Sequence, residues 1–428
     1  MTNGKISLIG FGISNRAVYE MLRGYGYSFT VRSGDYVDVP PEIELIYGDG
    51  YLDTCEDMVF RSPSCMPYHI TGGGLITSEV SFALSHIGCH KIGVTGSDGK
   101  TTVCSLIKHI LDVEGLPAYY GGNNGYPLIN YVGKLKEKDI LVCELSSFQL
   151  IDLIPVPECA VITNITPNHM DIHSSHKEYV DAKANILKGV KRAVLNMDCT
   201  ETCALSSLVD SNADITYATL KDMSRADFDG YSYVYPKNGW IYRNRDAVLP
   251  LSCIKLRGEF NILNVCLAVG AVYPYVGIKG LEYGVSTFEG VSHRMELIAE
   301  KNGVRYYDSS IDSTPSRTIA TLSSFDKPRT AVILGGYDKS LSYDSLQDGL
   351  KGIKCAVICG ANSEKIFRAV CGVCDTVLCD SFAESVRIAS GACKPGDSVV
   401  LSPASASYDM FKNYMEKANK FKEIVRGL

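Results

Sequence analysis

Short apolar runs alternate with amphipathic stretches along the chain, and this alternation predicts strands followed by helices. Near the start, an apolar run over residues 5–9 precedes a helical pattern over 16–23 and a second run over 27–31. Farther on, the runs over 140–143 and 160–164 are almost wholly apolar, as in strands buried on both faces of a parallel sheet. The pattern therefore predicts an α/β fold of parallel sheets covered by helices.

The same alternation divides the chain into three parts. Strands are predicted in its last third at residues 304–308, 330–334, 355–359, 376–379 and 398–402. We expect three domains: a Rossmann-like N-terminal domain over residues 1–88, a P-loop-type central domain over 89–290, and a doubly wound α/β C-terminal domain over 291–428.

Composition and net charge exclude several classes of protein. A net charge of −6 over 428 residues gives no basic excess, so we expect no nucleic-acid partner. The 16 cysteines follow no repeating framework and are expected to be reduced thiols in a cytoplasmic protein. The chain enters its first strand without a leader, and no apolar run reaches the roughly 18 residues of a membrane span, so no membrane partner is expected.

The strongest chemical signal is a glycine-rich turn between a predicted strand and a predicted helix. Its expected phosphate-binding residues are Gly96, Ser97, Asp98, Gly99, Lys100, Thr101 and Thr102. The lysine can reach the outer phosphates of a nucleotide, and the first threonine can ligate Mg²⁺. The strict Walker A spacing is absent, because position 94 is Val. The alternative is a glycine-rich turn that carries a surface lysine.

A weaker phosphate signal opens the N-terminal part. Gly12, Ile13 and Ser14 lie between the first strand and its helix, where a nucleotide phosphate can meet a helix N-terminus. Arg32 follows the second strand and could meet a phosphate or a uracil group, and Ser62 ends a later strand. The alternative is that these are ordinary βα turns.

Several residues of the central part are candidates for a metal centre. Glu144 ends a buried strand, where a carboxylate suits Mg²⁺, although it could instead cap a helix. His169 follows the next strand and is the better histidine for a nucleotide–Mg²⁺ centre, while His173 and His176 are expected to be solvated. Lys183 lies on a predicted helix, and taken by itself it is a surface lysine.

Two amides mark the helix that follows residue 256. Asn264 lies one turn beyond Asn261, so both side chains share one face. They could read the edge of an adenine, or they could cap the helix.

Six segments in order along the whole chain resemble the Mur ligase family, namely residues 95–102, 121–123, 144–150, 164–171, 293–294 and 401–407. The resemblance implies ATP-dependent amide formation in peptidoglycan precursor synthesis, through an acyl phosphate. It implies UDP-N-acetylmuramoyl-L-alanine and D-glutamate as substrates, ATP and two Mg²⁺ ions as cofactors, and a cytoplasmic monomer.

The resemblance also implies roles for single residues. Lys100, Asn123, His169 and Lys183 are expected to be catalytic, with Lys183 carbamylated. Metal ligation is expected from Thr101, Glu144, His169 and Lys183. Beyond the phosphate loop, ATP is expected to be held by Asn264, Arg294 and Asp308. The uridine nucleotide is expected to be held by Gly12, Ile13, Ser14, Arg32, Ser62 and Asn123.

For the acceptor amino acid, the positions that match the family are Lys339, Ser407, Tyr408 and Tyr414. Residues 308–315 depart from the family pattern, because a lysine is missing and Asp312 adds a charge expected to repel a carboxylate. We therefore expect Arg317 to turn inward and supply the second cation. The alternative is that Arg317 is exposed to solvent and Lys339 suffices.

Two other functions stay open. One is a related ligase with a different acceptor, such as a folate polyglutamate ligase or a ligase of lipid-linked precursors. The other is a regulatory nucleotide-binding protein without turnover.

Overall fold

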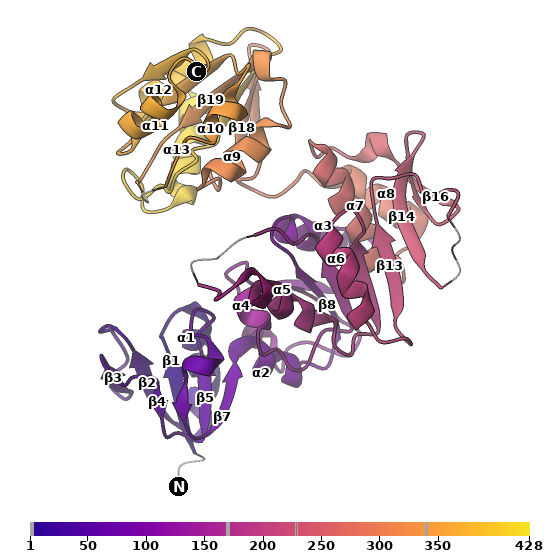
Figure 1. Ribbon diagram of the computed structural model, residues 1–428, viewed down its shortest axis with the longest axis vertical. Helices are drawn as coiled ribbons and strands as arrows, with labels where there is room; N and C mark the ends of the chain where they lie inside the picture. Colours follow the sequence, from indigo (N-terminus) through magenta and orange to yellow (C-terminus); the bar gives the residue numbers. More distant parts are fainter. Residues whose placement is uncertain (1–3, 168–171, 227, 229, 339–340) are drawn as a thin grey trace. The chain divides into compact units, whose positions relative to one another are not determined.

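The computed structural model describes residues 4–428 except 168–171, 227, 229 and 339–340, and these described residues form two compact units (Figure 1). The first unit contains residues 1–254 and 260–288, and the second contains 255–259 and 289–428. Each unit is described by itself. None of the described helices is long and apolar enough to cross a bilayer.

The first unit begins with a parallel sheet in the order β3-β2-β1-β5-β7. Its strands are β1 (Lys5–Ile9), β2 (Ser28–Ser33), β3 (Glu44–Tyr47), β5 (Met58–Arg61) and β7 (Leu75–Ser78). Its helices are α1 (Ile13–Leu22) and α2 (Glu79–His86), and a small separate ladder joins β4 (Asp53–Thr54) to β6 (Thr71–Gly72). Helix α1 begins three residues before the predicted start at residue 16.

The second sheet of this unit has the order β16-β15-β14-β13-β12-β11-β8-β10-β9, parallel up to β14 and antiparallel beyond it. Its strands are β8 (His90–Thr95), β9 (Ala118–Gly122), β10 (Ile140–Glu144), β11 (Cys159–Ile162), β12 (Arg192–Asn196), β13 (Asp214–Ala218), β14 (Ser232–Lys237), β15 (Trp240–Arg243) and β16 (Asp246–Pro250). Its helices are α3 (Lys100–Val113), α4 (Ser147–Leu150), α5 (His176–Ala184), α6 (Thr200–Ala204), α7 (Glu259–Val272) and α8 (Ile278–Thr287).

The second unit has a sheet in the order β17-β18-β22-β19-β20-β21, in which only β17 is antiparallel among the described strands. Its strands are β17 (Glu296–Lys301), β18 (Val304–Asp308), β19 (Thr330–Leu334), β20 (Cys355–Ile358), β21 (Thr376–Leu378) and β22 (Ser398–Leu401). Its helices are α9 (Pro315–Leu322), α10 (Leu346–Leu350), α11 (Ser363–Val370), α12 (Phe382–Gly391) and α13 (Tyr414–Arg426). The predicted strands of this part are confirmed to within one residue.

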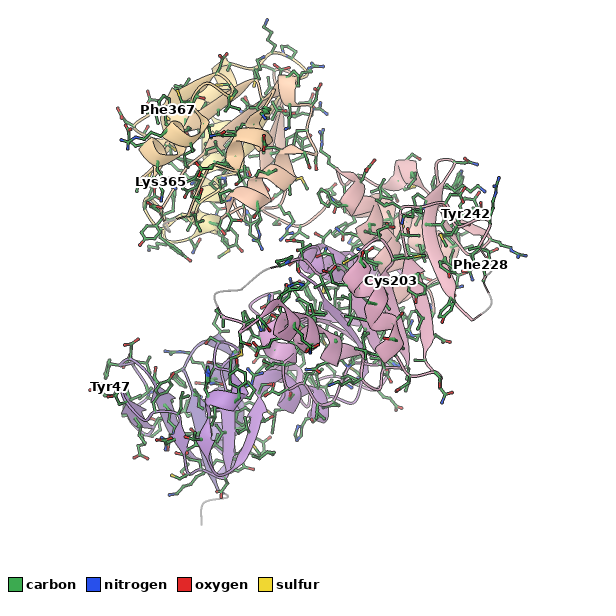
Figure 2. All side chains as sticks on the ribbon, viewed as in Figure 1. Tyr47, Cys203, Phe228, Tyr242, Lys365 and Phe367 are labelled. Atoms are coloured by element: carbon green, nitrogen blue, oxygen red, sulfur yellow. The ribbon has the colours of Figure 1, made fainter. Side chains whose placement is uncertain are left out.

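Separate apolar cores hold the layers together. In the second unit, α12 and α13 pack on one face of the sheet, and α9, α10 and α11 pack on the other. Figure 2 shows Lys365 and Phe367 on α11: Phe367 packs on the core, while Lys365 pairs with Asp338 at the surface. In the first unit, one continuous core joins residues of both sheets, including Leu84 on α2 and Leu128 beside β9. The predicted α/β fold class is therefore confirmed, while the domain boundaries at 88 and 290 stay predictions.

A buried carboxyl also joins the two sheets of the first unit. Glu79 opens α2, and its Oε1 accepts a hydrogen bond from the Ile129 N–H at 2.7 Å, in a 3₁₀ turn beside the second sheet. Burial raises the pKa of Glu79 to about 7. The folded state thus prefers the protonated carboxyl. This preference stabilises the fold fully below the ordinary pKa of about 4.5 and is lost as pH rises through about 7.

We expect Glu79→Gln to remove this pH dependence. Between about pH 5.5 and 8.5, the wild-type Tm should fall relative to that of the variant, by the equivalent of about 2–3 kcal/mol, because only wild type buries a charge at the higher pH. Thermal unfolding followed by circular dichroism measures the difference. Glu137→Gln, at an exposed position, is the matched control. Parallel pH profiles for wild type and Glu79→Gln would contradict the prediction.

Candidate functional site

The glycine-rich turn connects β8 to α3 in a backbone conformation that residues with a Cβ rarely adopt. Gly96 has φ +146° and Gly99, which caps α3, has φ +83°. A Cβ on Gly96 would lie 1.9 Å from Thr163 Oγ1, and one on Gly99 would lie 2.7 Å from Asn264 Oδ1. The turn therefore requires glycine at both positions, and it leads directly into the N-terminus of a 14-residue helix, a setting suited to anions.

The neighbouring strand fixes this turn. Because β11 pairs with β8 in parallel register, with Ile162 beside Thr95, the residues after both strands leave the same edge of the sheet. The Asn164 side chain accepts from the Asp98 N–H at 3.0 Å and donates to the Asp98 carbonyl at 3.1 Å. The Thr163 hydroxyl donates to the same carbonyl at 2.5 Å. These two residues were not predicted; their place directly after a buried parallel strand is the signal that could have found them.

Two lysines meet at this turn. Lys100 Nζ donates to the carbonyls of Gly96 at 2.8 Å and Ser97 at 3.0 Å. Lys183 Nζ donates to the same Gly96 carbonyl at 2.9 Å, and its side chain is 2% exposed. Burial, and after it the charge of Lys100, lower the pKa of Lys183 well below its usual value. The interpretation of Lys183 as a surface lysine is therefore wrong: its amine is buried, and the lowered pKa shifts the balance from the ammonium toward the uncharged amine.

The threonines of the turn lie at the start of α3, where Thr101 is half-buried and Thr102 is buried. Glu144 lies at the end of β10, beside Val94 of β8 and Gly122 of β9. Its Oε1 accepts from Asn123 Nδ2 at 3.3 Å, and its Oε2 accepts from the Tyr120 hydroxyl at 2.5 Å. A buried carboxylate is thus held at the same edge of the sheet as the phosphate turn, and the alternative of a helix cap is wrong, because Ser146 caps α4.

The amides of α7 lie against the same turn. Asn264 Nδ2 donates to Asn261 Oδ1 at 2.9 Å, and Asn264 Oδ1 faces Gly99. Both side chains are buried. The predicted shared face is confirmed, and it lies beside the phosphate turn.

The candidate histidines His173 and His176 differ in burial and in the residues they contact. His169 lies outside the described residues. His176 is half-exposed near Glu201, whereas His173 is buried, with Nε2 2.9 Å from Ser147 Oγ. The expectation that His173 is solvated is therefore wrong, because its ring packs between Phe148 and Tyr179.

The candidate uridine contacts lie at the carboxyl edge of the first sheet. Gly12 and Ile13 are exposed at the start of α1, Ser14 is half-buried, and the Ser62 N–H donates to the Ile9 carbonyl at 3.0 Å. Arg32 is different, because its Nε and Nη2 donate to Glu56 Oε1 at 3.2 and 3.0 Å in a buried ion pair. Any uridine group would meet Arg32 as part of that pair and not as a free cation.

In the second unit, Asp308 ends β18 and is fully buried. Its Oδ1 accepts from the Ser310 N–H at 2.9 Å, and its Oδ2 lies 2.8 Å from His293 Nδ1. Arg294, next to His293, is half-buried and acts electrostatically on Asp312. This cluster supplies both a carboxylate and a guanidinium for a polar ligand.

Asp312 does not act as a free charge. It is buried, and it accepts from the hydroxyls of Thr321 and Ser402, each at 2.7 Å. Burial raises the pKa of Asp312. The expectation that Asp312 repels an acceptor carboxylate is therefore weakened by its hydroxyl shell, and Arg317 is exposed on α9 and not turned inward as expected.

The other acceptor candidates differ in exposure. Lys339 lies outside the described residues. Ser407 is buried, Tyr414 is partly exposed, and Tyr408 is 65% exposed. The Tyr337 N–H donates to the Ala406 carbonyl at 2.8 Å, which joins the segment directly after β19 to the segment that carries Ser407.

Comparisons with known proteins identify the family models that match this chain and the relatives it resembles. Two family models match, the Mur ligase middle domain over residues 94–272 and the glutamate ligase domain of Mur ligases over 293–405. A UDP-N-acetylmuramoylalanine–D-glutamate ligase of Clostridium botulinum is 35% identical, covering 99% of this chain and 97% of its own. The enzyme of that name from Ruminiclostridium cellulolyticum is 34% identical, covering 100% and 97%.

Solved structures share the fold. A UDP-N-acetylmuramate–alanine ligase from Thermotoga maritima has a TM-score of 0.64 at 15% identity, over 99% of this chain and 100% of its own. The MurF ligase from the same organism, solved with ADP, has a TM-score of 0.61 at 16% identity, over 100% and 96%.

Proposed function

This chain belongs to the Mur ligase family, and from that premise we propose how its residues carry out the reaction. The chain is an ATP-dependent ligase of peptidoglycan precursor synthesis. We propose UDP-N-acetylmuramoyl-L-alanine as the donor and D-glutamate as the acceptor, in a cytoplasmic monomer. The observation that carries the proposal is the full-length similarity to ligases of that specificity, together with the two lysines on the Gly96 carbonyl.

The chain's groups suit this chemistry. In the proposal, the donor's carboxylate attacks the γ-phosphorus of ATP, and the acceptor's amine then displaces phosphate from the acyl phosphate. Lys100 and the turn N–H groups stabilise the charge that develops on the transferred phosphoryl group. Asn123 positions the donor carboxylate beside Glu144, and in the proposal His169 lines the same donor carboxylate. Asn264, Arg294 and Asp308 hold the nucleoside and phosphate side of ATP.

The donor set fits divalent magnesium. Glu144 offers a buried carboxylate, and Thr101 offers a hydroxyl at the start of α3. Bound Mg²⁺ would neutralise phosphate charge, and we propose Thr101, Glu144, His169 and carbamylated Lys183 as its ligands at two positions. Gly12, Ile13, Ser14, Ser62 and the Arg32–Glu56 pair are proposed to hold the uridine nucleotide.

Phosphate release tests the function directly. With UDP-N-acetylmuramoyl-L-alanine, ATP and Mg²⁺, phosphate release should require an amino acid and be fastest with D-glutamate in a panel of amino acids.

We expect Lys100→Ala to lower kcat by about 100-fold or more, since it removes a charge that acts on the transition state. Lys108→Ala, on the same helix and paired with Asp112 at the surface, is the matched control.

Three outcomes would count against this assignment. Near-normal release by Lys100→Ala would remove the phosphate turn from the mechanism. Faster release with a neutral amino acid would indicate a related ligase, and ATP binding without turnover would indicate a regulatory protein.

Lys183 carries a second prediction. Its neutral amine can add to CO₂, forming an N–C bond and releasing a proton, and the remaining N–H can still donate to the Gly96 carbonyl. The carbamate then supplies anionic oxygen for Mg²⁺. We expect Lys183→Ala to lose at least about 100-fold in kcat, and acetate to restore part of it, because a short carboxylate can occupy the vacated space.

A carbamate carbon signal after labelling with ¹³C-bicarbonate, absent in Lys183→Ala, would identify the group. Lys177→Ala is the control on the same helix, since Lys177 is exposed and pairs with Asp181. Full activity of Lys183→Ala without carboxylate would exclude the proposal.

The acceptor site gives a third prediction. We propose that Lys339, Ser407, Tyr408 and Tyr414 hold D-glutamate and that Arg317, which is exposed on α9, is not a ligand. Lys339→Ala should raise the KM for D-glutamate about tenfold and leave the KM for ATP unchanged, because only the acceptor carboxylate loses a cation. Steady-state kinetics measure both constants, and Arg317→Ala is the control, with both constants expected to match wild type. A raised KM for D-glutamate in Arg317→Ala would contradict the proposal.

A further inference from the structure

His173 is a buried imidazole in the loop between β11 and α5, with 3% of its surface exposed. Its Nε2 lies 2.9 Å from the hydroxyl of Ser147, the first residue of α4. Ser147 is itself buried. One hydrogen bond therefore connects the segment that follows Glu144 at the end of β10 to the segment after β11.

The ring of His173 makes two further contacts. It stacks on Phe148 of α4 at 4.9 Å with an interplanar angle of 6°, and it meets the edge of Tyr179 of α5 at 5.3 Å. The imidazole thus fills the space between α4 and α5, and no other described polar side chain joins Ser147.

Tyr179 extends this contact to the phosphate turn. Its hydroxyl lies 2.8 Å from Ser97 Oγ, and its ring lies 4.7 Å from Lys183 Nζ. Ser97 in turn donates to the Thr166 carbonyl and accepts from the Thr166 N–H, both at 2.9 Å. A continuous series of contacts therefore runs from Ser147 through His173 and Tyr179 to the turn.

Helix α4 is also held by the first sheet. Arg61 at the end of β5 donates to the Phe148 carbonyl at 2.8 Å and forms an ion pair with Asp152. With contacts to both Arg61 and His173, the short helix has little freedom to shift.

We propose that His173 is a positioning residue of the ligase reaction, which aligns the segment after Glu144 and the Tyr179–Lys183 turn of α5 with the phosphate turn. This inference rests on the proposed function and deepens it. Neither Ser147 nor His173 touches a nucleotide in this role; each acts through its neighbours.

The charge state of the ring agrees with this role. Burial lowers the pKa of His173, Glu178 raises it, and Lys183 lowers it. Glu178 Oε2 lies 3.8 Å from His173 Nδ1, beyond hydrogen-bonding distance. In either tautomer a neutral ring can form the Nε2 hydrogen bond with the Ser147 hydroxyl, as acceptor or as donor.

The test compares three variants with wild type. His173→Phe keeps a flat ring against Phe148 and removes the hydrogen-bonding nitrogen, Ser147→Ala removes the hydroxyl, and His173→Gln restores a hydrogen-bonding side chain. We expect His173→Phe and Ser147→Ala each to lower kcat at least about tenfold, with the KM for D-glutamate within about twofold of wild type. The double variant should lose little more than either single one, since both remove one hydrogen bond. His173→Gln should recover part of kcat.

His86→Phe is the matched control, because His86 stacks on Phe82 at 4.1 Å but lies exposed on α2, and it should behave as wild type. Mg–ATP affinity, measured by titration calorimetry, gives a readout that does not need the acceptor. It should fall at least about fivefold in His173→Phe and stay unchanged in His86→Phe.

The outcomes separate the two proposals. If wild type binds Mg–ATP but releases no phosphate with any acceptor, the proposed function fails, and the affinity comparison still decides the role of His173. If His173→Phe keeps wild-type kcat and Mg–ATP affinity, the inference is wrong. The inference would also be overturned if kcat and Mg–ATP affinity fell only in proportion to a lowered Tm and His173→Gln recovered neither. His173 would then have a purely structural role.

Discussion

One carbonyl oxygen, that of Gly96, accepts hydrogen bonds from both Lys100 and Lys183. Two ammonium groups within reach of the same oxygen repel each other, and this repulsion contributes to the lowered pKa of Lys183. The Asp98 carboxylate acts in the opposite sense on Lys183 and raises its pKa, but less than burial and Lys100 lower it. The turn thus brings two lysine amines to one oxygen at the N-terminus of a helix, a setting that favours an anion.

Sheet topology explains why the other groups gather around this oxygen. Strands β10, β8 and β11 are neighbours in parallel register, so Glu144, the turn and Asn164 leave one edge of the sheet together. The glycines then allow the approach, because a side chain at Gly96 would collide with Thr163. The positions of these groups follow from register and not from loop conformation, which gives the site a rigid base.

Much of this could be predicted from the sequence. The strand pattern, the turn and the placement of Glu144 at a strand end depend on local periodicity, which a sequence displays directly. Burial of Lys183 and His173 could not be predicted, because it depends on α5 packing against α4 and the turn. The Arg32–Glu56 pair was missed for the same reason, since its members are 24 residues apart and meet only in the folded sheet. Two signals were overlooked: the place of Thr163 and Asn164 directly after a buried strand, and the spacing of Tyr179 and Lys183, four residues apart on a helix.

The buried polar groups of the two units differ in how they are hydrogen-bonded, and this difference has a physical basis. Around the phosphate turn, buried polar groups are coupled: the guanidinium of Arg61 needs Asp152, and the hydroxyl of Ser147 needs His173. Changing one partner leaves the other buried without a hydrogen bond, which costs about 1–3 kcal/mol or more. Around Asp312, in contrast, hydroxyls of Thr321 and Ser402 surround a carboxyl whose raised pKa favours the neutral form. Hydroxyls can donate or accept by rotating, so they tolerate a change of partner. Removing one partner should therefore destabilise the fold more at the paired groups of the first unit than at the hydroxyls around Asp312.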